Sequence, residues 1–211
     1  MAYPVLRQTI MPLLLRRLQV MGLENLPERP PYIIVANHVS YLDAPMIGLV
    51  LAVKANTQAY YLTHKSIARW FGRLIGEKFL GMIPIPPEKK SQAVELAIVQ
   101  LKQGKNVGIF PEATRNNDTS NLLKGKTGAA RLALATSLPV IPIGVIAPPL
   151  RTISGALKTF FFTRWPLGVV FGKPLYFTAP ASQEITKEYL EGVTREIMQA
   201  IGQLCHKNYS F

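Results

Sequence analysis

The stretch Asn37-His38-Val39-Ser40-Tyr41-Leu42-Asp43 follows directly on the apolar run Tyr32-Ile33-Ile34-Val35-Ala36. The apolar run is rich in β-branched residues and is preceded by two prolines, which predicts a buried strand. This strand delivers Asn37 and His38 to its carboxyl end. Asp43 comes five residues after the histidine and is followed by a proline and a second apolar run, so a helix is predicted to start near Asp43.

His38 and Asp43 are therefore predicted to lie at the two ends of a short strand-to-helix connection. A carboxylate that holds one ring nitrogen fixes the tautomer of an imidazole and raises its basicity, which suits a general base for a hydroxyl. The chain has only three histidines and two aspartates, so this spacing is uncommon by chance. Two structural roles stay open on the pattern alone: Asp43 as a helix N-cap and His38 as a hydrogen-bonded loop residue.

The charge of the chain points to an anionic partner. Its 211 residues include 24 lysines and arginines against 12 acidic residues, which gives a net charge of +12 and a pI of about 10.0. Nucleic acid, an anionic membrane surface and a phosphorylated substrate all fit such a charge. The basic residues are dispersed, no nucleic-acid-binding motif occurs, and apolar faces accompany them. We therefore expect a membrane surface with anionic lipids as a partner, and no nucleic acid.

The N-terminal segment, residues 1–21, is predicted to be amphipathic, helical and membrane-associating. Apolar side chains cover most of its helical wheel, three arginines interrupt them, and Pro12 is expected to kink or split the helix. A helix packed on the core is the alternative. No apolar run is long enough to span a bilayer, and no signal-peptide cleavage site occurs. We expect a peripheral protein at the cytoplasmic face of the membrane, with residues 22–211 as one compact domain.

Beyond residue 53, predicted strands alternate with predicted helices. Strands are expected over residues 57–63, 82–85, 106–110, 140–146, and 168–171 with 175–177; helices over 67–76, 89–103, 125–137 and 186–206. Residues 151–166 are expected to form a less regular connection. The alternation predicts a single α/β domain whose largely parallel or mixed sheet is flanked by helices. The single Cys205 excludes an internal disulfide, and we interpret it as a packed thiol on the last helix.

A second polar cluster follows the strand predicted over residues 106–110. Glu112 and Arg115 are expected at the carboxyl end of the sheet, where ligands of open α/β folds collect. Arg115 is suited to hold a phosphate through two parallel hydrogen bonds, and Glu112 to accept a hydrogen bond from a hydroxyl or to fix the arginine. Lys65, at the end of another predicted strand, would add a positive charge. A structural Glu–Arg pair that caps the turn is the alternative.

No metal or nucleotide site is predicted. The triplet Gly125-Lys126-Thr127 resembles the end of a phosphate-binding loop, but Ser120 stands where the first glycine belongs. The sequence contains no glycine-rich dinucleotide fingerprint and no cysteine–histidine spacing suited to zinc. We therefore expect neither a metal nor another cofactor.

The two polar stretches carry a family resemblance. Residues 37–43 and Phe110-Pro111-Glu112-Ala113-Thr114-Arg115 resemble the NHxSxxD and FPEGTR motifs of the 1-acylglycerol-3-phosphate acyltransferase (PlsC) family. Lys124-Gly125 with residues 128–133 resembles the family's KxG-rich helix, and residues 138–143 resemble its last proline-containing strand. Lys65 with residues 81–84 resembles its weaker second motif. The motifs occur in the family's order over about residues 20–180.

The resemblance assigns roles to individual residues. It implies two catalytic residues, His38 and Asp43, and a substrate-binding set made up of Glu112, Arg115, Lys65, Asn37, Ser40 and Thr114. Ala113 departs from the family pattern, in which glycine is usual and permits a close backbone approach or a positive φ. Asn116 stands where serine is common.

The resemblance also implies an activity. A fatty acyl group would pass from a thioester, either acyl-carrier protein or coenzyme A, to the free hydroxyl of a lysophospholipid, giving phosphatidic acid when the acceptor is 1-acylglycerol-3-phosphate. His38 would take the hydroxyl proton while Asp43 orients its ring. A related acyltransferase acting on glycerol-3-phosphate or another lyso-lipid is an alternative, and so is a basic peripheral lipid-binding domain without catalysis.

Overall fold

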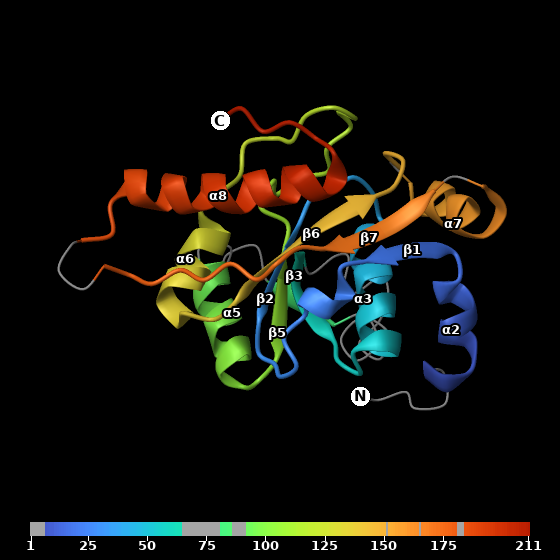
Figure 1. The fold of residues 1–211 in the computed structure, drawn as a ribbon, viewed down its shortest axis with the longest axis horizontal. Coiled ribbons are helices and arrows are strands. Elements are labelled where there is room, and N and C mark those ends of the chain that lie inside the picture. The colour runs from blue at the N-terminus through green and yellow to red at the C-terminus, as the bar shows by residue number, and fades with distance from the viewer. Residues whose placement is uncertain (1–6, 65–80, 86–91, 151, 165, 181–183) are drawn as a thin grey trace.

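The computed structural model describes residues 7–64, 81–85, 92–150, 152–164, 166–180 and 184–211 (Figure 1). Its centre is a seven-stranded sheet in the order β1-β7-β6-β2-β5-β3-β4. The strands are β1 (Leu18–Met21), β2 (Ile33–Ala36), β3 (Ala59–His64), β4 (Met82–Ile85), β5 (Asn106–Ile109), β6 (Val140–Ile146) and β7 (Leu167–Phe171). The predicted α/β domain with a mixed sheet flanked by helices is confirmed.

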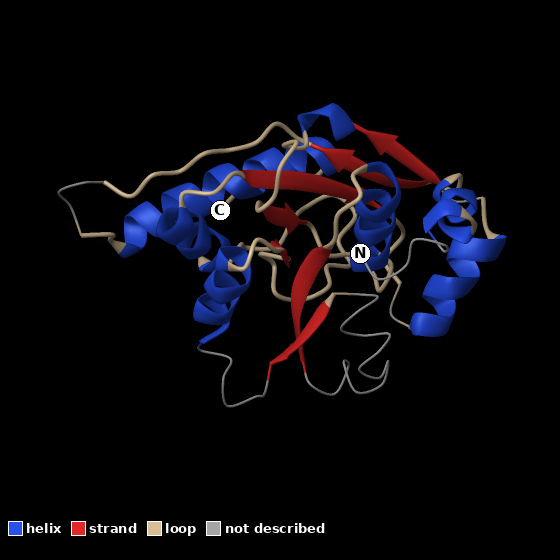
Figure 2. Cartoon of the chain, turned by 90° about the horizontal axis from the view of Figure 1, so that it is seen from below, coloured by secondary structure: helices blue, strands red, loops and turns tan. Residues whose placement is uncertain are grey.

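Helices cover both faces of this sheet (Figures 1 and 2). They are α2 (Ile10–Leu15), α3 (Asp43–Lys54), α5 (Ala93–Lys102), α6 (Gly128–Thr136), α7 (Ile153–Phe162) and α8 (Lys187–Cys205), with a short 3₁₀ helix η1 (Leu23–Asn25). One hydrophobic cluster joins α3 and α7 to the sheet, and a second joins α5, α6 and α8 to its other face. None of the helices in the described ranges combines the length and apolar character needed to cross a bilayer.

The central strand β2 explains why the first apolar run has no polar alternation. Ile34 and Ala36 belong to one hydrophobic cluster, and Ile33 and Val35 belong to the other. Each of these side chains is almost completely buried. Burying a Val or Ile side chain contributes about 1.5–3 kcal/mol, so a strand with two buried faces selects an unbroken apolar run.

Strand direction decides which loops share one end of the sheet. β6, β2, β5, β3 and β4 are mutually parallel, whereas β7 is antiparallel to β6 and parallel to β1. We call the end at which β2, β5 and β6 finish the carboxyl end of the sheet. Because β7 and β1 run the other way, these two strands begin at the carboxyl end.

The N-terminal segment differs from the helical prediction for residues 1–21. Within residues 7–21, Arg7 and Gln8 are helical, Thr9 is a turn and α2 follows, with Pro12 in its first turn, where a missing N–H group costs little. Residues 18–21 form β1, which pairs with β7 along the edge of the sheet. Leu15 and Leu18 are buried in the core, so this part of the segment packs on the domain. The backbone hydrogen bonds offered by β7 outweigh the local helical pattern.

The connection after β6 also differs from its prediction, because residues 153–162 form α7. The Thr152 side chain caps this helix by accepting a hydrogen bond from the Gly155 N–H at 3.1 Å. Ala156 and Phe160, four residues apart, pack into the core. Of the predicted strand over residues 175–177, only Leu175 pairs, through an isolated antiparallel bridge with Val140.

Two further predictions concern residues 67–76 and Cys205. The predicted helix over residues 67–76 lies outside the described residues. Cys205 is buried on α8, as predicted, and burial is the main reason that its pKa is raised to about 11. At neutral pH this thiol is therefore a protonated core side chain.

Candidate active site

Two neighbouring strands bring the two motifs together. β2 ends at Ala36 and β5 ends at Ile109, and the strands pair in parallel with Val35 opposite Ile109. Residues 37–43 and 110–116 therefore leave the sheet side by side at its carboxyl end.

The imidazole of His38 contacts the carboxylate of Asp43. Nδ1 of His38 lies 2.6 Å from Oδ2 of Asp43. A carboxylate accepts hydrogen bonds only, so we assign the hydrogen to Nδ1, which leaves Nε2 with a free lone pair. The His38 side chain is 22% exposed, whereas Asp43 is fully buried. The ring is thus held by a buried group while part of it stays accessible to solvent.

The Asp43 carboxylate also fixes the backbone of the turn. Oδ2 accepts hydrogen bonds from the N–H groups of Val39 at 2.7 Å and Ser40 at 2.9 Å. Oδ1 accepts a hydrogen bond from Oγ of Ser40 at 2.9 Å. With His38, four donor groups converge on this carboxylate, which compensates its removal from water.

The structure revises the predicted substrate contacts of Asn37 and Ser40. Both residues are buried. Oδ1 of Asn37 accepts from the Val145 N–H at 2.7 Å, and Nδ2 donates to the Val145 carbonyl at 3.0 Å. Oγ of Ser40 accepts from the Leu42 N–H at 2.9 Å in addition to its bond with Asp43. Because these polar atoms are engaged inside the protein, the two residues position the turn between β2 and α3.

Glu112 joins the second motif to the backbone of His38. Its Oε1 accepts a hydrogen bond from the His38 N–H at 2.9 Å, and Oε2 accepts one from the Leu123 N–H at 2.9 Å. The Asn116 N–H donates to the His38 carbonyl at 2.7 Å. Glu112 is buried, with both carboxylate oxygens bound to backbone amides. Among the described contacts Glu112 makes no ion pair with Arg115, and its predicted hydrogen bond to a substrate hydroxyl stays a prediction.

A row of stacked rings supports the imidazole. The ring centroids of His38 and Phe110 are 4.3 Å apart, and those of Phe110 and Tyr61 are 5.5 Å apart. Tyr61 lies opposite Gly108 in the pairing of β3 with β5, and a Cβ atom on Gly108 would stand 2.1 Å from the Tyr61 ring. Burial, and secondarily the charge of Asp43, raise the pKa of Tyr61. The strand register brings this tyrosine beside the motif, which is why residue patterns did not predict it.

Arg115 lies over an aromatic ring of the first motif. Its guanidinium carbon is 4.0 Å from the ring centroid of Tyr41, a cation–π contact. Among the residues that the structure describes, no carboxylate lies within ion-pair distance of Arg115. The guanidinium therefore keeps donors for an anion. Thr114 is exposed beside it. Lys65 lies outside the described residues.

Ala113, which stands where the family usually has glycine, adopts a backbone conformation that is unfavourable for a residue with a side chain. Ala113 adopts φ +58°, in the left-handed region that favours glycine. The residue is exposed, so its methyl group gains little from burial. An L-residue in this region costs roughly 1–2 kcal/mol relative to the right-handed conformation. The second motif thus carries local strain at the position where the family usually has glycine.

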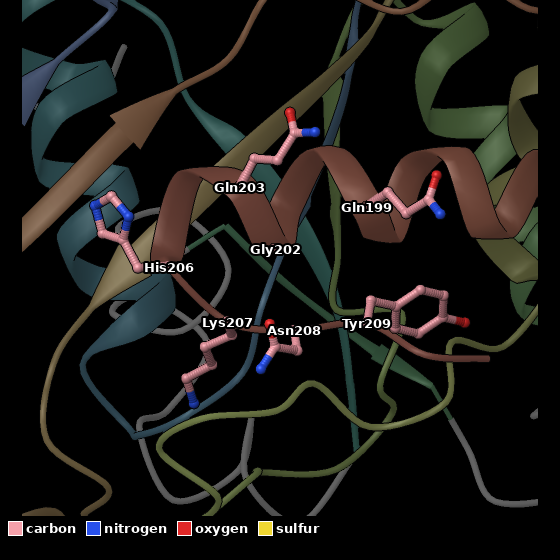
Figure 3. A pocket seen from close by; sticks show the side chains of 7 residues that line it. All are labelled: Gln199, Gly202, Gln203, His206, Lys207, Asn208 and Tyr209. Atoms are coloured by element: carbon pink, nitrogen blue, oxygen red, sulfur yellow. The ribbon is translucent and has the colours of Figure 1, made fainter.

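Residues 207–209 clamp the loop that follows the second motif. The Asn208 N–H donates to the Ser120 carbonyl at 2.8 Å, and the Asn208 carbonyl accepts from the Leu122 N–H at 2.8 Å. Lys207 Nζ donates to the Asp118 carbonyl. Figure 3 shows Lys207, Asn208 and Tyr209 below the end of α8. The clamp holds Leu122, and the N–H group of the next residue, Leu123, donates to Glu112. Because Glu112 also accepts from the His38 N–H, the clamp is connected to the backbone of His38.

The clamp was not predicted, because its central contacts join backbone groups and leave no side-chain signature. Beside it lies an open hollow of about 650 Å³, lined by Gln199, Gly202, Gln203, His206, Lys207, Asn208 and Tyr209 (Figure 3). None of the predicted site residues lines this hollow. No group of three or more potential metal ligands occurs within the described part of the chain.

Comparison with known proteins identifies similar sequences over most of the chain. Residues 17–146 match the family model described as Acyltransferase. The 1-acyl-sn-glycerol-3-phosphate acyltransferase of Bacillus subtilis (strain 168) is 27% identical over 192 residues, which are 90% of this chain and 88% of that protein. The 1-acyl-sn-glycerol-3-phosphate acyltransferase alpha of Mus musculus is 31% identical over 137 residues, which are 60% of this chain and 44% of that protein.

A solved structure shares the fold. The crystal structure of the 1-acyl-sn-glycerophosphate (LPA) acyltransferase PlsC from Thermotoga maritima superposes with a TM-score of 0.60 at 21% identity. The superposition covers 97% of this chain and 83% of that one. The layers and strand order described above therefore belong to a known architecture.

Replacing Ala113 by glycine is expected to stabilise the protein. The substitution Ala113→Gly removes the Cβ atom that the left-handed backbone disfavours, so the free energy of unfolding should rise by about 1 kcal/mol. Urea denaturation measures the change. The matched control is Ala135→Gly at an exposed position of α6, where the same substitution should lower stability by up to about 1 kcal/mol. A destabilised Ala113→Gly variant would contradict the strain at this position.

Interrupting the clamp is expected to loosen the loop that holds Glu112. Asn208→Pro removes the N–H group that donates to the Ser120 carbonyl, whereas Asn208→Ala keeps the backbone bonds and is the matched control. Amide hydrogen exchange at Leu122 and Leu123 should accelerate about tenfold or more in Asn208→Pro, because lost hydrogen bonds lower the free energy of local opening. Equal exchange in both variants would show that the clamp does not hold the loop.

Proposed function

This chain belongs to the acyltransferase family and is an enzyme of acyl transfer, and on that premise we propose that it acylates the free hydroxyl of 1-acylglycerol-3-phosphate to give phosphatidic acid. The named activities of the bacterial and mammalian relatives support this acceptor. The donor in our proposal is a fatty acyl thioester of acyl-carrier protein or coenzyme A. The contact of 2.6 Å between Nδ1 of His38 and Oδ2 of Asp43 is the observation that carries the mechanism.

His38 acts as the general base in this proposal. Nε2 takes the proton of the acceptor hydroxyl while that oxygen attacks the thioester carbonyl. The carbon–sulfur bond then breaks, and the departing thiolate recovers a proton from the imidazolium, so that the products are an ester and a free thiol. Asp43 keeps Nδ1 protonated and stabilises the positive ring. General-base assistance of this kind is worth about 10²–10⁴ in rate.

Arg115 holds the phosphate of the acceptor in this proposal, with Thr114 beside it and Lys65 as a further positive charge. Support comes from the guanidinium, which has no carboxylate partner in the described ranges and stacks on Tyr41, three residues after His38. Holding the phosphate there would align the hydroxyl with His38 and lower the entropic cost of reaction. Glu112, Asn116 and Asn37 act as positioning residues, because their bonds are made to the protein backbone.

The proposed reaction needs no metal or other cofactor, because a thiolate is a good leaving group and the proton stays between substrate and imidazole. We place the enzyme at the cytoplasmic face of a membrane as a peripheral protein. A net charge of +12 and the exposed apolar residues of α2 support this location. The acceptor reaches such an enzyme by lateral diffusion in the lipid.

Replacing His38 tests the base. His38→Ala should lower kcat by at least about 10²-fold with either thioester donor, since the acceptor hydroxyl loses its proton acceptor. Turnover of 1-acylglycerol-3-phosphate by the purified protein measures the effect, and thermal denaturation checks that the variant is folded. Near-normal turnover would remove His38 from the mechanism.

Asp43→Asn separates orientation from basicity in the same assay. The substitution keeps the size of the side chain but turns an acceptor into a mixed donor and acceptor, so Nδ1 no longer has to carry the hydrogen. We expect a fall in kcat comparable to that of His38→Ala, and no further fall when both substitutions are combined, because the two residues act as a unit. Independent, multiplicative losses would contradict a coupled pair.

Replacing Arg115 tests the phosphate contact. Arg115→Ala should raise the acceptor KM about tenfold or more while leaving the donor KM nearly unchanged, since only the acceptor carries the phosphate that Arg115 binds. Arg115→Lys, which keeps the charge but loses the planar fork, should recover part of the loss. A neutral acceptor without phosphate, such as a monoacylglycerol, is the substrate control. Equal effects on both KM values would exclude this role.

A further inference from the structure

Helix α7 is apolar on two sides. Its inward side packs Ala156 and Phe160 into the core. On its outward side Leu157 and Phe161 are each 52% exposed, and Phe162 is 83% exposed. We call Leu157, Phe161 and Phe162 the outer face of α7. Monomeric proteins rarely leave neighbouring large apolar side chains uncovered, so this face is expected to meet a partner.

The topology places α7 at the same end of the sheet as His38. The helix connects β6 to β7, and this antiparallel pair meets with Ile146 opposite Gly168. β6 is parallel to β2, so the end of β6 and the start of β7 both lie at the carboxyl end of the sheet. α7 leaves from and returns to that end, which also carries residues 37–43.

Helix α2 also ends at the carboxyl end of the sheet. β1 pairs in parallel with β7, and its first residue Leu18 is opposite Leu167. Arg17, between α2 and β1, donates hydrogen bonds to the carbonyls of Phe160, at 3.0 Å, and Thr163 at the end of α7. Ile10 and Leu13 of α2 are more than half exposed. Both ribbon views show α2 and α7 together at one extremity of the molecule (Figures 1 and 2).

The charge around these helices has one sign. The sequence contains no acidic residue among residues 1–23 or among residues 152–164, whereas these two segments carry five lysines and arginines. Lys158 within α7 and Arg164 just after it are exposed. An apolar helical face flanked by Lys158 and Arg164 fits a partner with an apolar interior and an anionic surface.

We propose that the outer face of α7, together with Ile10 and Leu13 of α2, docks this protein on an anionic lipid bilayer. The aromatic and aliphatic side chains enter the interface between headgroups and acyl chains, while Lys158 and Arg164 contact lipid phosphates. This contact turns the carboxyl end of the sheet toward the lipid. The docking deepens the membrane location given in the proposed function by naming the surface that makes the contact, and delivery of the acceptor from the same bilayer rests on the proposed acyl transfer.

The test uses the full chain and vesicles of mixed phosphatidylcholine and phosphatidylglycerol. The variant Leu157→Ser/Phe161→Ser/Phe162→Ser removes the outer face without replacing a buried residue. Its partition coefficient in vesicle co-sedimentation should fall at least 100-fold, at about tenfold for each phenylalanine. The matched control is Val99→Ser/Tyr176→Ser, which removes exposed apolar side chains on α5 and after β7 and should bind like the wild type.

A second variant tests the charge. Lys158→Glu/Arg164→Glu should weaken binding to the mixed vesicles about tenfold or more, and added salt should reduce that difference. Vesicles of phosphatidylcholine alone should bind the wild type more weakly and discriminate little between the wild type and this variant. Equal binding of the variant and the wild type to mixed vesicles would overturn the electrostatic part of the proposal.

Two readouts separate docking from catalysis and from protein contacts. With a short-chain lysophosphatidate below its micellar concentration, the outer-face variant should turn over like the wild type, whereas its turnover of acceptor held in vesicles should fall with binding. If neither protein acylates any acceptor, the proposed function fails while the vesicle comparison still decides the docking. Unchanged vesicle binding of the outer-face variant would overturn the proposal. The proposal would also fail if the wild type were a dimer in lipid-free solution and the outer-face substitutions made it monomeric, because the face would then be a contact between two protein chains.

Discussion

The buried carboxylate of Asp43 is the group on which the architecture of the site depends. A carboxylate removed from water is unfavourable unless donors surround it, and here the donors come from His38, Val39 and Ser40. The same four hydrogen bonds that satisfy Asp43 therefore dictate the path of the turn and the orientation of the imidazole. Since Asp43 is also the first residue of α3, the helix carries this anchor at a fixed distance from β2.

The rest of the site holds the backbone of His38 in place. Glu112 accepts from its N–H group, and the Asn116 N–H donates to its carbonyl, so the two motifs form one unit. Phe110 supports the face of the ring. Each of these partners is itself held, Glu112 through the Leu123 amide and Phe110 through its contact with Tyr61. Such layered support restricts the imidazole to one orientation, as the proposed general base requires.

Local patterns in the sequence were sufficient for β2, the start of α3 and the His38–Asp43 contact, because all three depend on residues close together in the chain. Residues 18–21 were predicted to be helical and instead pair with β7, a partner almost 150 residues away. The backbone contacts of Glu112 were not predicted for a similar reason, since its partners are backbone amides at positions 38 and 123. Thr152 and the spacing of Ala156 and Phe160 did signal α7, although the segment was interpreted as irregular.

The antiparallel pairing of β7 with β6 makes the two ends of the sheet different. In a wholly parallel sheet, the helix after β6 would carry the chain back to the opposite end of the sheet. Here β7 is antiparallel to β6, so α7 stays at the carboxyl end, next to the end of β6. The proposed chemistry and the proposed membrane contact can thus share one end of the sheet. For an enzyme oriented in this way, turnover follows the surface density of its acceptor, so diluting that lipid within the membrane would slow it even at constant bulk amount.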